Sequence, residues 1–183
     1  MSERRLYLLR HAKSSWKDAG IADHDRPLAG RGRKAAKAMG AWMREQRVKP
    51  ELVLCSSATR ARQTFERLEP LGAREVHIER ELYGADAPTL LGRLRDVPES
   101  VASVMLIGHN PGMEDLALVL AQWEATKFPT GALAILGLDR PWGSLEKATA
   151  VLVDFVKPRE LDDRFHDPRT RLGASRGAGS PPT

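Results

Sequence analysis

Short apolar runs alternate with segments of helical periodicity over most of the 183-residue chain. The clearest run, residues 104–107, is Val-Met-Leu-Ile, which is typical of a strand buried on both faces of a parallel sheet. The alternation itself predicts an α/β fold with a mostly parallel central sheet of about six strands, covered by helices in a three-layer α-β-α sandwich. The expected strands are residues 5–9, 51–55, 76–78, 102–107, 132–136 and 149–155, with 102–107 in the centre.

Four helices are expected between these strands. The segment 31–47 shows the 3.6-residue period most clearly. Its apolar side carries Ala35, Met39, Trp42 and Met43, and its polar side carries Arg33, Lys37 and Arg44. The other three run through residues 61–68, 90–94 and 113–120.

The length fits one domain. We expect this domain over residues 1–159, followed by a flexible C-terminal tail at 160–183, where the periodicity is lost and the chain finishes Gly-Ala-Gly-Ser-Pro-Pro-Thr. The N-terminal apolar run, residues 6–9, is too short for a signal peptide, and no stretch reaches the roughly 18 apolar residues of a membrane span. The single cysteine, Cys55, cannot form an internal disulfide. These features predict a cytoplasmic protein that does not span a membrane.

Positive charge is concentrated in one segment. Residues 26–49 hold eight Arg or Lys side chains and one acidic side chain, Glu45. Such a run is either a solvated helix face or a field that attracts an anionic substrate, a nucleic acid or an acidic protein. Because basic and aromatic residues are not interleaved, as they are in nucleic-acid stacking platforms, we expect no nucleic-acid partner. The sequence leaves the oligomeric state open.

Polar residues follow three of the expected strands. Arg10 and His11 follow the first, Ser56 and Ser57 with Arg60 follow the second, and the segment 108–112 with His109 follows the fourth. In open α/β sheets ligands bind outside the carboxyl ends of the strands, so these residues are expected to meet there.

The chemistry of these residues suits a phosphate group. Arginine offers a planar fork that matches phosphate oxygens, and a helix N-terminus favours an anion. Asn110 is expected to cap the fourth helix with Pro111 in its first turn, and Ser56 or Ser57 to cap the second. His11 is then the candidate covalent nucleophile.

Rival chemistries find less support in the sequence. Cys55 and Arg60 resemble a cysteine phosphatase loop, but four residues intervene where that loop has five, and a buried thiol at the end of a strand is the simpler interpretation. The five histidines show no metal-ligand spacing, so no metal is expected, and His77 is expected to face solvent from its short strand.

Three motifs, in this order, resemble the histidine phosphatase superfamily, also called phosphoglycerate-mutase-like. They are Leu9-Arg10-His11-Ala12, the segment 56–64 (Ser-Ser-Ala-Thr-Arg-Ala-Arg-Gln-Thr) and Gly108-His109-Asn110-Pro111. The segment 25–28 leading to Gly32, and the segment 82–85, are most similar to the small SixA-type phosphohistidine phosphatases. The resemblance covers roughly residues 5–157.

The resemblance implies a role for each matching residue. His11 would take the phosphoryl group, Arg10 and Arg60 would bind it, and His109 would complete the pocket, with neither metal nor organic cofactor. Ala12 departs from the glycine that many members carry, which matters only if that position needs a positive φ.

Further site residues remain open. Lys13, Ser57 and Asn110 are additional candidates for phosphate binding, although Lys13 could be a solvated loop residue and Ser57 a helix cap. Glu81 and Asp86 are the candidate proton donors, but neither aligns convincingly with the carboxylate of larger family members.

The preferred function is a phosphatase that works through a phosphohistidine on His11 and acts on a phosphorylated substrate such as a phosphohistidine-bearing protein. A phosphoramidate has a better leaving group than an alkyl phosphate, so a dedicated acid is less necessary. Two alternatives remain: a broad phosphatase acting on small phosphate esters or nucleotides, and a non-catalytic phosphate-binding module.

Overall fold

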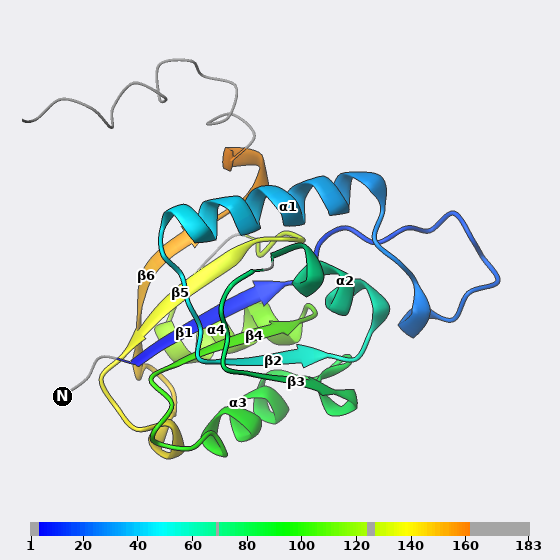
Figure 1. Ribbon diagram of the computed structural model, residues 1–183. Coiled ribbons are helices and arrows are strands. Elements are labelled where there is room, and N and C mark those ends of the chain that lie inside the picture. The colour runs from blue at the N-terminus through cyan, green and yellow to red at the C-terminus, as the bar shows by residue number, and fades with distance from the viewer. Residues whose placement is uncertain (1–3, 69, 124–126, 162–183) are drawn as a thin grey trace, which may run out of the picture.

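The computed structural model describes residues 4–68, 70–123 and 127–161. A single six-stranded sheet runs through it in the order β3-β2-β4-β1-β5-β6 (Figure 1). The strands are β1 (Arg4–Arg10), β2 (Leu52–Ser56), β3 (Glu75–Glu79), β4 (Ser103–Gly108), β5 (Leu133–Leu138) and β6 (Ala150–Val156). All six predicted strands are confirmed, with bounds shifted by one or two residues.

The sheet is mostly parallel, as predicted. β4 lies between β1 and β2 and pairs parallel with both, which confirms it as a central strand. β5 pairs antiparallel with β1 and with β6, so it is the one strand of this sheet that runs against the others. The carboxyl ends of β1, β2 and β4 therefore lie at the same edge.

Helices cover both faces of the sheet (Figure 1). One face packs against α1 (Gly30–Glu45) and α2 (Thr59–Leu68), and the other against α3 (Ala87–Arg95) and α4 (Gly112–Ala121). Alternate residues of β1 supply the two cores: Leu6 and Leu8 belong to the cluster under α3 and α4, and Leu9 to the cluster under α1 and α2. This is the period of two that a strand imposes on its side chains.

The basic helix α1 is amphipathic, as its sequence indicates. Met39, Trp42 and Met43 are buried, while Lys34 and Lys37 are exposed. Ala35 is only partly buried and its neighbour Ala36 takes its place in the core, a small rotation of the predicted apolar side.

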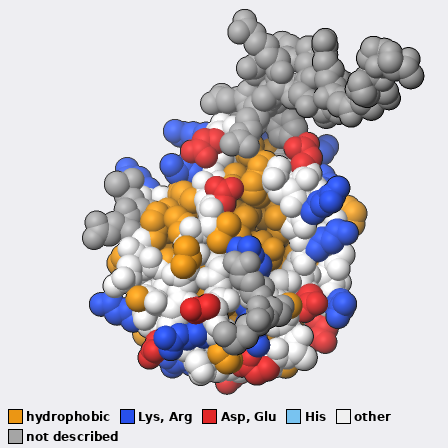
Figure 2. All heavy atoms as spheres, turned by 90° about the vertical axis from the view of Figure 1, so that its left-hand side faces the viewer, with side chains coloured by type: hydrophobic (Ala, Val, Ile, Leu, Met, Phe, Trp, Pro, Cys, Tyr) orange, Lys and Arg blue, Asp and Glu red, His pale blue; other side chains and the backbone are white. Residues whose placement is uncertain are grey.

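The two edge strands expose apolar side chains that a buried strand would hide. On β3 both Val76 and Ile78 are about half exposed, and His77 between them is also exposed, as expected. On β6 the exposed residues are Val151 and Val153. Figure 2 shows hydrophobic side chains gathered on the side of the molecule that is to the left in Figure 1, where β6 lies.

Three short 3₁₀ helices complete the described structure: η1 (Asp23–Asp25), η2 (Arg80–Leu82) and η3 (Trp142–Ser144). Among the described residues, no helix combines the length and apolarity needed to cross a bilayer. Leu161 is buried in the cluster under α1 and α2. The rest of the expected tail, residues 162–183, lies outside the described residues.

Candidate active site

The predicted meeting point at the carboxyl edge of the sheet is present. Arg10 on β1 is in register with Gly108 on β4, and the His11 N–H donates to the Gly108 carbonyl at 3.0 Å. The two chain segments therefore leave the sheet side by side. As a result, the His11 and His109 rings lie 4.9 Å apart between centroids.

The ring of His11 is fixed in one neutral form. Its Nδ1 lies 2.7 Å from the carbonyl oxygen of Ala12. A carbonyl only accepts, so Nδ1 carries the hydrogen and Nε2 keeps its lone pair. Burial is the main cause that lowers the pKa of His11 to about 3; the Ala12 bond opposes this shift, while His109 and the charges of Arg60 and Arg10 add to it. His11 therefore offers a neutral nitrogen nucleophile at physiological pH.

Backbone contacts hold the segment that follows His11. The Ala12 N–H donates to Thr64 Oγ1 at 3.0 Å, and this hydroxyl donates to the Arg60 carbonyl at 2.7 Å. Ala12 has no positive φ, so alanine is accommodated there without strain. A Cβ on Gly32 would approach the Lys13 carbonyl to 2.1 Å, so only glycine lets α1 pack this closely against the segment that follows His11.

Arg10 is anchored beside an acidic partner. Its Nη1 donates to the Phe128 carbonyl at 2.7 Å, and its buried Nε has no hydrogen-bond partner among the described residues. Burial lowers the pKa of Arg10, and the charge of Glu114 opposes that shift. Glu114 also accepts the Phe128 N–H at 3.1 Å, so it fixes the segment to which Arg10 is bound.

His109 is the second buried histidine. Its Nε2 lies 2.7 Å from Ser56 Oγ, and its buried Nδ1 has no partner among the described residues. Burial, followed by the charge of Arg60, lowers the pKa of His109 to about 4. Ser56 Oγ also accepts the Ala58 N–H, and its own hydrogen can be donated to His109 Nε2. In the tautomer that accepts this hydrogen, the ring hydrogen is on Nδ1, where it can be donated to an anion.

Arg60 joins this group from the start of α2. Its side chain is 8% exposed, and its Nη2 pairs with Asp23 Oδ2 at 3.0 Å while Nη1 donates to the Asp23 carbonyl at 2.5 Å. The Tyr83 hydroxyl donates to the same Oδ2 at 2.7 Å. This bond, together with the charge of Arg60, lowers the pKa of Asp23 to about 2. Asp23 is therefore an ionised group that holds Arg60 in place.

Two predicted helix caps are wrong. α4 begins at Gly112 with Pro111 before it, and the Asn110 amide instead donates to Glu114 Oε2 at 2.8 Å and to the Phe128 carbonyl at 3.2 Å. The amide nitrogen thus orients the Asn110 side chain, and its buried Oδ1, the atom that a cap would use, has no hydrogen-bond partner among the described residues. The start of α4 also needs glycine, because a Cβ on Gly112 would lie 2.0 Å from the Ala85 carbonyl.

The expected serine cap of α2 also fails. The helix begins at Thr59, and the Ala58 carbonyl accepts its first backbone bonds, so neither Ser56 nor Ser57 is in the capping position. The Ser57 hydroxyl contacts His24 Nε2 at 2.8 Å instead.

The remaining sequence candidates lie on the segments that follow β1 and β3. Lys13 is partly buried in the segment after His11, and Glu81 is exposed on η2. Asp86 is exposed and caps α3 by accepting the Thr89 N–H, a bond that lowers its pKa. Cys55 is fully buried, and burial raises the pKa of its thiol to about 12, as expected of an inert core cysteine. Among the described residues no group of three or more His, Cys, Asp or Glu is placed to hold a metal ion.

Sequence reasoning did not assign roles to several residues of this site: Asp23, Tyr83, Thr64 and Glu114. Asp23 and Tyr83 belong to or adjoin the segments 25–28 and 82–85 that carry the family resemblance. The resemblance of those segments was the sequence feature that could have pointed to Asp23 and Tyr83. Their contacts were not predictable from local pattern, because Asp23 lies 37 residues from Arg60 and 60 residues from Tyr83 in the chain.

Comparisons with known proteins agree with this geometry. Residues 6–110 match the model of the histidine phosphatase superfamily, branch 1, and the chain belongs to that superfamily. Within it the chain is similar to SixA proteins. It is 32% identical over 141 residues to the phosphohistidine phosphatase SixA of Escherichia coli K12, covering 74% of this chain and 86% of that protein.

Two other relatives extend the match. The structure of the protein histidine phosphatase SixA complexed with tungstate aligns with a TM-score of 0.74 at 28% identity, covering 86% of this chain and 98% of that one. An uncharacterized protein of Mycobacterium tuberculosis H37Rv is 41% identical over 161 residues, which is 82% of this chain and 100% of the relative.

Proposed function

We propose that this protein is a phosphohistidine phosphatase that passes the phosphoryl group through Nε2 of His11. The observation that carries the proposal is the bond from His11 Nδ1–H to the Ala12 carbonyl. It fixes the tautomer whose Nε2 is free to attack, beside the ring of His109 and within reach of the charges of Arg10 and Arg60. The SixA names of the relatives support the choice of substrate.

The first half of the reaction transfers the phosphoryl group to the enzyme. Nε2 of His11 attacks phosphorus, and the bond between phosphorus and the substrate's imidazole nitrogen breaks. The electron pair stays on that nitrogen, and because the substrate's ring carries a proton on its other nitrogen, it leaves as neutral imidazole. His11 keeps its Nδ1 hydrogen and now carries the phosphoryl group on Nε2. Little covalent assistance is required, since phosphoryl transfer depends mainly on positioning and charge neutralisation.

The surrounding donors suit the equatorial oxygens of the transferring group. Arg60 and Arg10 bring positive charge, and the Nδ1–H of His109 is directed by the Ser56 hydroxyl bound to Nε2. Arg10 Nε and His109 Nδ1 are buried without partners among the described residues, and unpaired buried donors favour an anion.

In the second half, water attacks phosphorus and the bond to His11 Nε2 breaks, with its electron pair returning to Nε2. Both protons of the water leave on inorganic phosphate, and His11 returns to its neutral form with its hydrogen on Nδ1. Asp23, which pairs with Arg60, has a lowered pKa and holds no proton to donate near neutral pH, and Asp86 accepts the Thr89 N–H at the start of α3. These two carboxylates therefore favour an activated substrate. A substrate with a good leaving group needs no such donor.

Rapid-quench trapping tests the proposal with a phosphohistidine peptide and with p-nitrophenyl phosphate. We expect acid-labile phosphate on the wild type, none on His11→Ala, and faster turnover of the peptide. The matched control is His77→Ala, which removes an exposed histidine on the edge strand β3 and is expected to label like the wild type. Label that persists on His11→Ala, or phosphate binding without label or hydrolysis of either compound, contradicts the proposal.

A further inference from the structure

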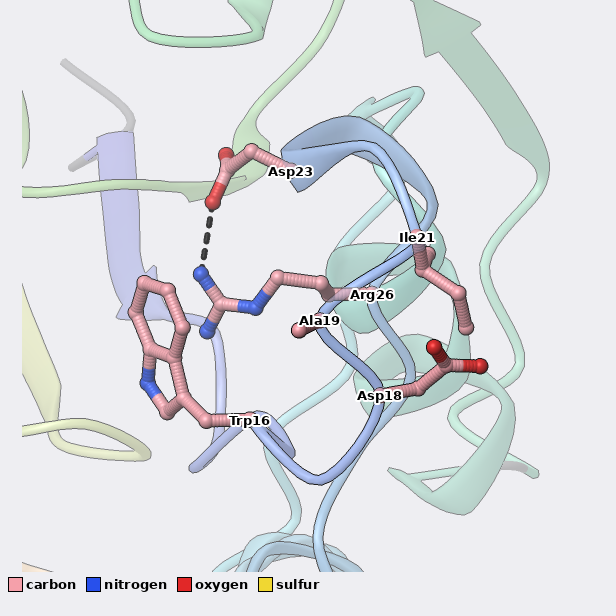
Figure 3. A pocket seen from close by; sticks show the side chains of 6 residues that line it. All are labelled: Trp16, Asp18, Ala19, Ile21, Asp23 and Arg26. Carbon is pink, nitrogen blue, oxygen red and sulfur yellow. Dashed lines mark hydrogen bonds and ion pairs between the residues drawn. The ribbon is translucent and has the colours of Figure 1, made fainter.

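A pocket of about 270 Å³ lies beside the phosphate-binding arginine, in the loop between β1 and α1. Its lining residues are Trp16, Asp18, Ala19, Ile21, Asp23 and Arg26 (Figure 3). None of them has a role in the chemistry proposed above except Asp23. The chemistry at His11 therefore does not explain why this pocket is present.

One carboxylate connects this pocket to the candidate active site. Asp23 Oδ1 pairs with Arg26 at 2.6 Å, and Asp23 Oδ2 pairs with Arg60 at 3.0 Å. The two oxygens belong to one carboxylate, so the pocket and the phosphate-binding guanidinium are separated by a single side chain. A group bound in the pocket would belong to the same molecule whose phosphoryl group reaches Arg60.

The loop is held at its base and through its middle. Ser14 and Leu28 form an antiparallel bridge, and the Ala29 N–H donates to the Lys13 carbonyl at 2.8 Å. Inside the loop, Arg26 Nε donates to the Ser15 carbonyl at 3.1 Å. A pocket built on such a braced loop is pre-formed, which reduces the entropy cost of binding.

The walls of the pocket are apolar but open to solvent. The guanidinium of Arg26 lies 3.2 Å from the centre of the Trp16 ring, and Figure 3 shows the two groups side by side. Trp16 is 71% exposed and Ile21 is 36% exposed. Exposed aromatic and aliphatic surface at the rim of a site is a feature of recognition surfaces.

The charges that line the pocket sum to a net negative value. Arg26 is buried and already paired with Asp23, so these two charges balance. Asp18 is left, with its Oδ1 accepting the Gly20 N–H at 3.0 Å and no ion pair among the described residues. A long side chain with an apolar stem and a cationic head matches such a lining.

We propose that this pocket binds a lysine or arginine side chain of the protein that carries the phosphohistidine. The inference rests on the proposed function and specifies its substrate class further. The stem of the basic residue would pack on Trp16 and Ile21, and its head would pair with Asp18. The protein would thus prefer phosphohistidine sites that have a basic residue close by.

Synthetic phosphohistidine peptides test the preference directly. In each peptide one position, from three residues before to three residues after the phosphohistidine, carries Lys, Ala or Glu. At one or more positions we expect kcat/KM for Lys to exceed that for Ala by about three- to five-fold, the size of a partly exposed ion pair. Equal values for Lys, Ala and Glu at every position overturn the inference.

Variants assign the preference to the pocket. Asp18→Asn keeps the acceptor for the Gly20 N–H but loses the charge, so the preference for Lys should disappear, and Asp18→Lys should reverse it in favour of Glu. Asp25→Asn is the matched control: it removes an exposed carboxylate of the same loop that does not line the pocket, and the preference should remain. A preference that survives in Asp18→Asn contradicts the assignment.

The proposed function is monitored separately by hydrolysis of p-nitrophenyl phosphate and by label on His11. If both occur while all peptides react equally, only the pocket inference fails. If neither peptide nor p-nitrophenyl phosphate is hydrolysed, the proposed function fails and the inference fails with it.

Discussion

The buried histidines His11 and His109 and the neighbouring loop between β1 and α1 are held by different kinds of interaction. His11 and His109 are almost fully buried, and burial is the first cause of both lowered pKa values. In the loop, Asp23 is half exposed and is held by ion pairs and a tyrosine hydroxyl. Desolvation therefore keeps the ring of His11 neutral, whereas charge pairing sets the position of Arg60.

The contrast predicts where substitutions will be costly. Removing the partner of a buried polar group costs the full desolvation penalty of that group. An exposed ion pair, by contrast, contributes little to stability by itself. Arg60 belongs to both regions, because it is buried itself while its partner Asp23 is half exposed. After His11 itself, it is the residue whose change should have the largest effect.

Replacing Arg60 with lysine should lower kcat/KM for the phosphohistidine peptide by about 10²–10³-fold, the cost of losing one preorganised donor at a developing charge. Lysine keeps the charge but cannot donate as a fork to a phosphate and to Asp23 at the same time. Steady-state kinetics measure the effect. Arg62→Lys, an exposed arginine of the same helix, is the control and should remain near the wild-type value. A loss below ten-fold in Arg60→Lys would mean that charge alone is sufficient.

The pH dependence of stability tests the burial of His11. Its pKa is about 3 in the folded protein and 6.5 ordinarily, so the unfolded chain binds more protons between these values. Stability is then complete above about pH 6.5 and falls as the pH drops toward 3. One such histidine contributes a loss of about 3 kcal/mol between pH 7 and pH 4, and His109 adds to it in the same direction.

Urea unfolding of the wild type and of His11→Gln across this pH range isolates the contribution. The variant cannot titrate at this position, so its free energy of unfolding should depend less steeply on pH. Parallel curves for the two proteins would show that His11 is not held neutral by burial.

Two adjacent serines compare the buried and exposed regions directly. Ser56 is fully buried and its hydroxyl contacts His109, while Ser57 contacts the more exposed His24. Ser56→Ala should lower the free energy of unfolding by about 1–3 kcal/mol, because a buried ring nitrogen loses its partner. Ser57→Ala should cost under about 1 kcal/mol. Thermal or urea unfolding measures both, and equal losses would remove the distinction between the two regions.

The sequence predicts the buried region well because its placement follows from the strands. Arg10, His11 and His109 come directly after apolar runs, and parallel strands bring their carboxyl ends together at one edge. The same local logic misplaced Asn110, since it did not include Glu114 and the Phe128 carbonyl, which bind the amide nitrogen and orient the side chain.

The contacts of the loop between β1 and α1 could not be predicted from the sequence. Asp23 reaches Arg60 and Tyr83, which come from other segments, and the loop contains no periodic pattern that points to them. Similarly, the apolar alternation of β3 gives no warning that Val76 and Ile78 lie on an edge strand and stay exposed. Contacts between distant segments decided these features, and such contacts leave little trace in local sequence.

The smallest predicted effect concerns Tyr83, whose hydroxyl binds Asp23 of the loop. The hydroxyl of Tyr83 is the first cause of the lowered pKa of Asp23, ahead of Arg60. Tyr83→Phe should therefore raise the pKa of Asp23 from about 2 toward its ordinary value, with only a minor change in stability because Asp23 is half exposed to water and Tyr83 is partly exposed. A titration of the carboxylate carbons by NMR measures the shift.

Asp86 is an internal reference in the same spectra, because its lowered pKa depends on the Thr89 N–H and not on Tyr83. A pKa of Asp23 that stays near 2 in Tyr83→Phe would assign its ionisation to the two arginines instead. In that case the loop would depend on charge pairing alone, and the contrast with the buried histidines, which are set by desolvation and backbone hydrogen bonds, would become sharper.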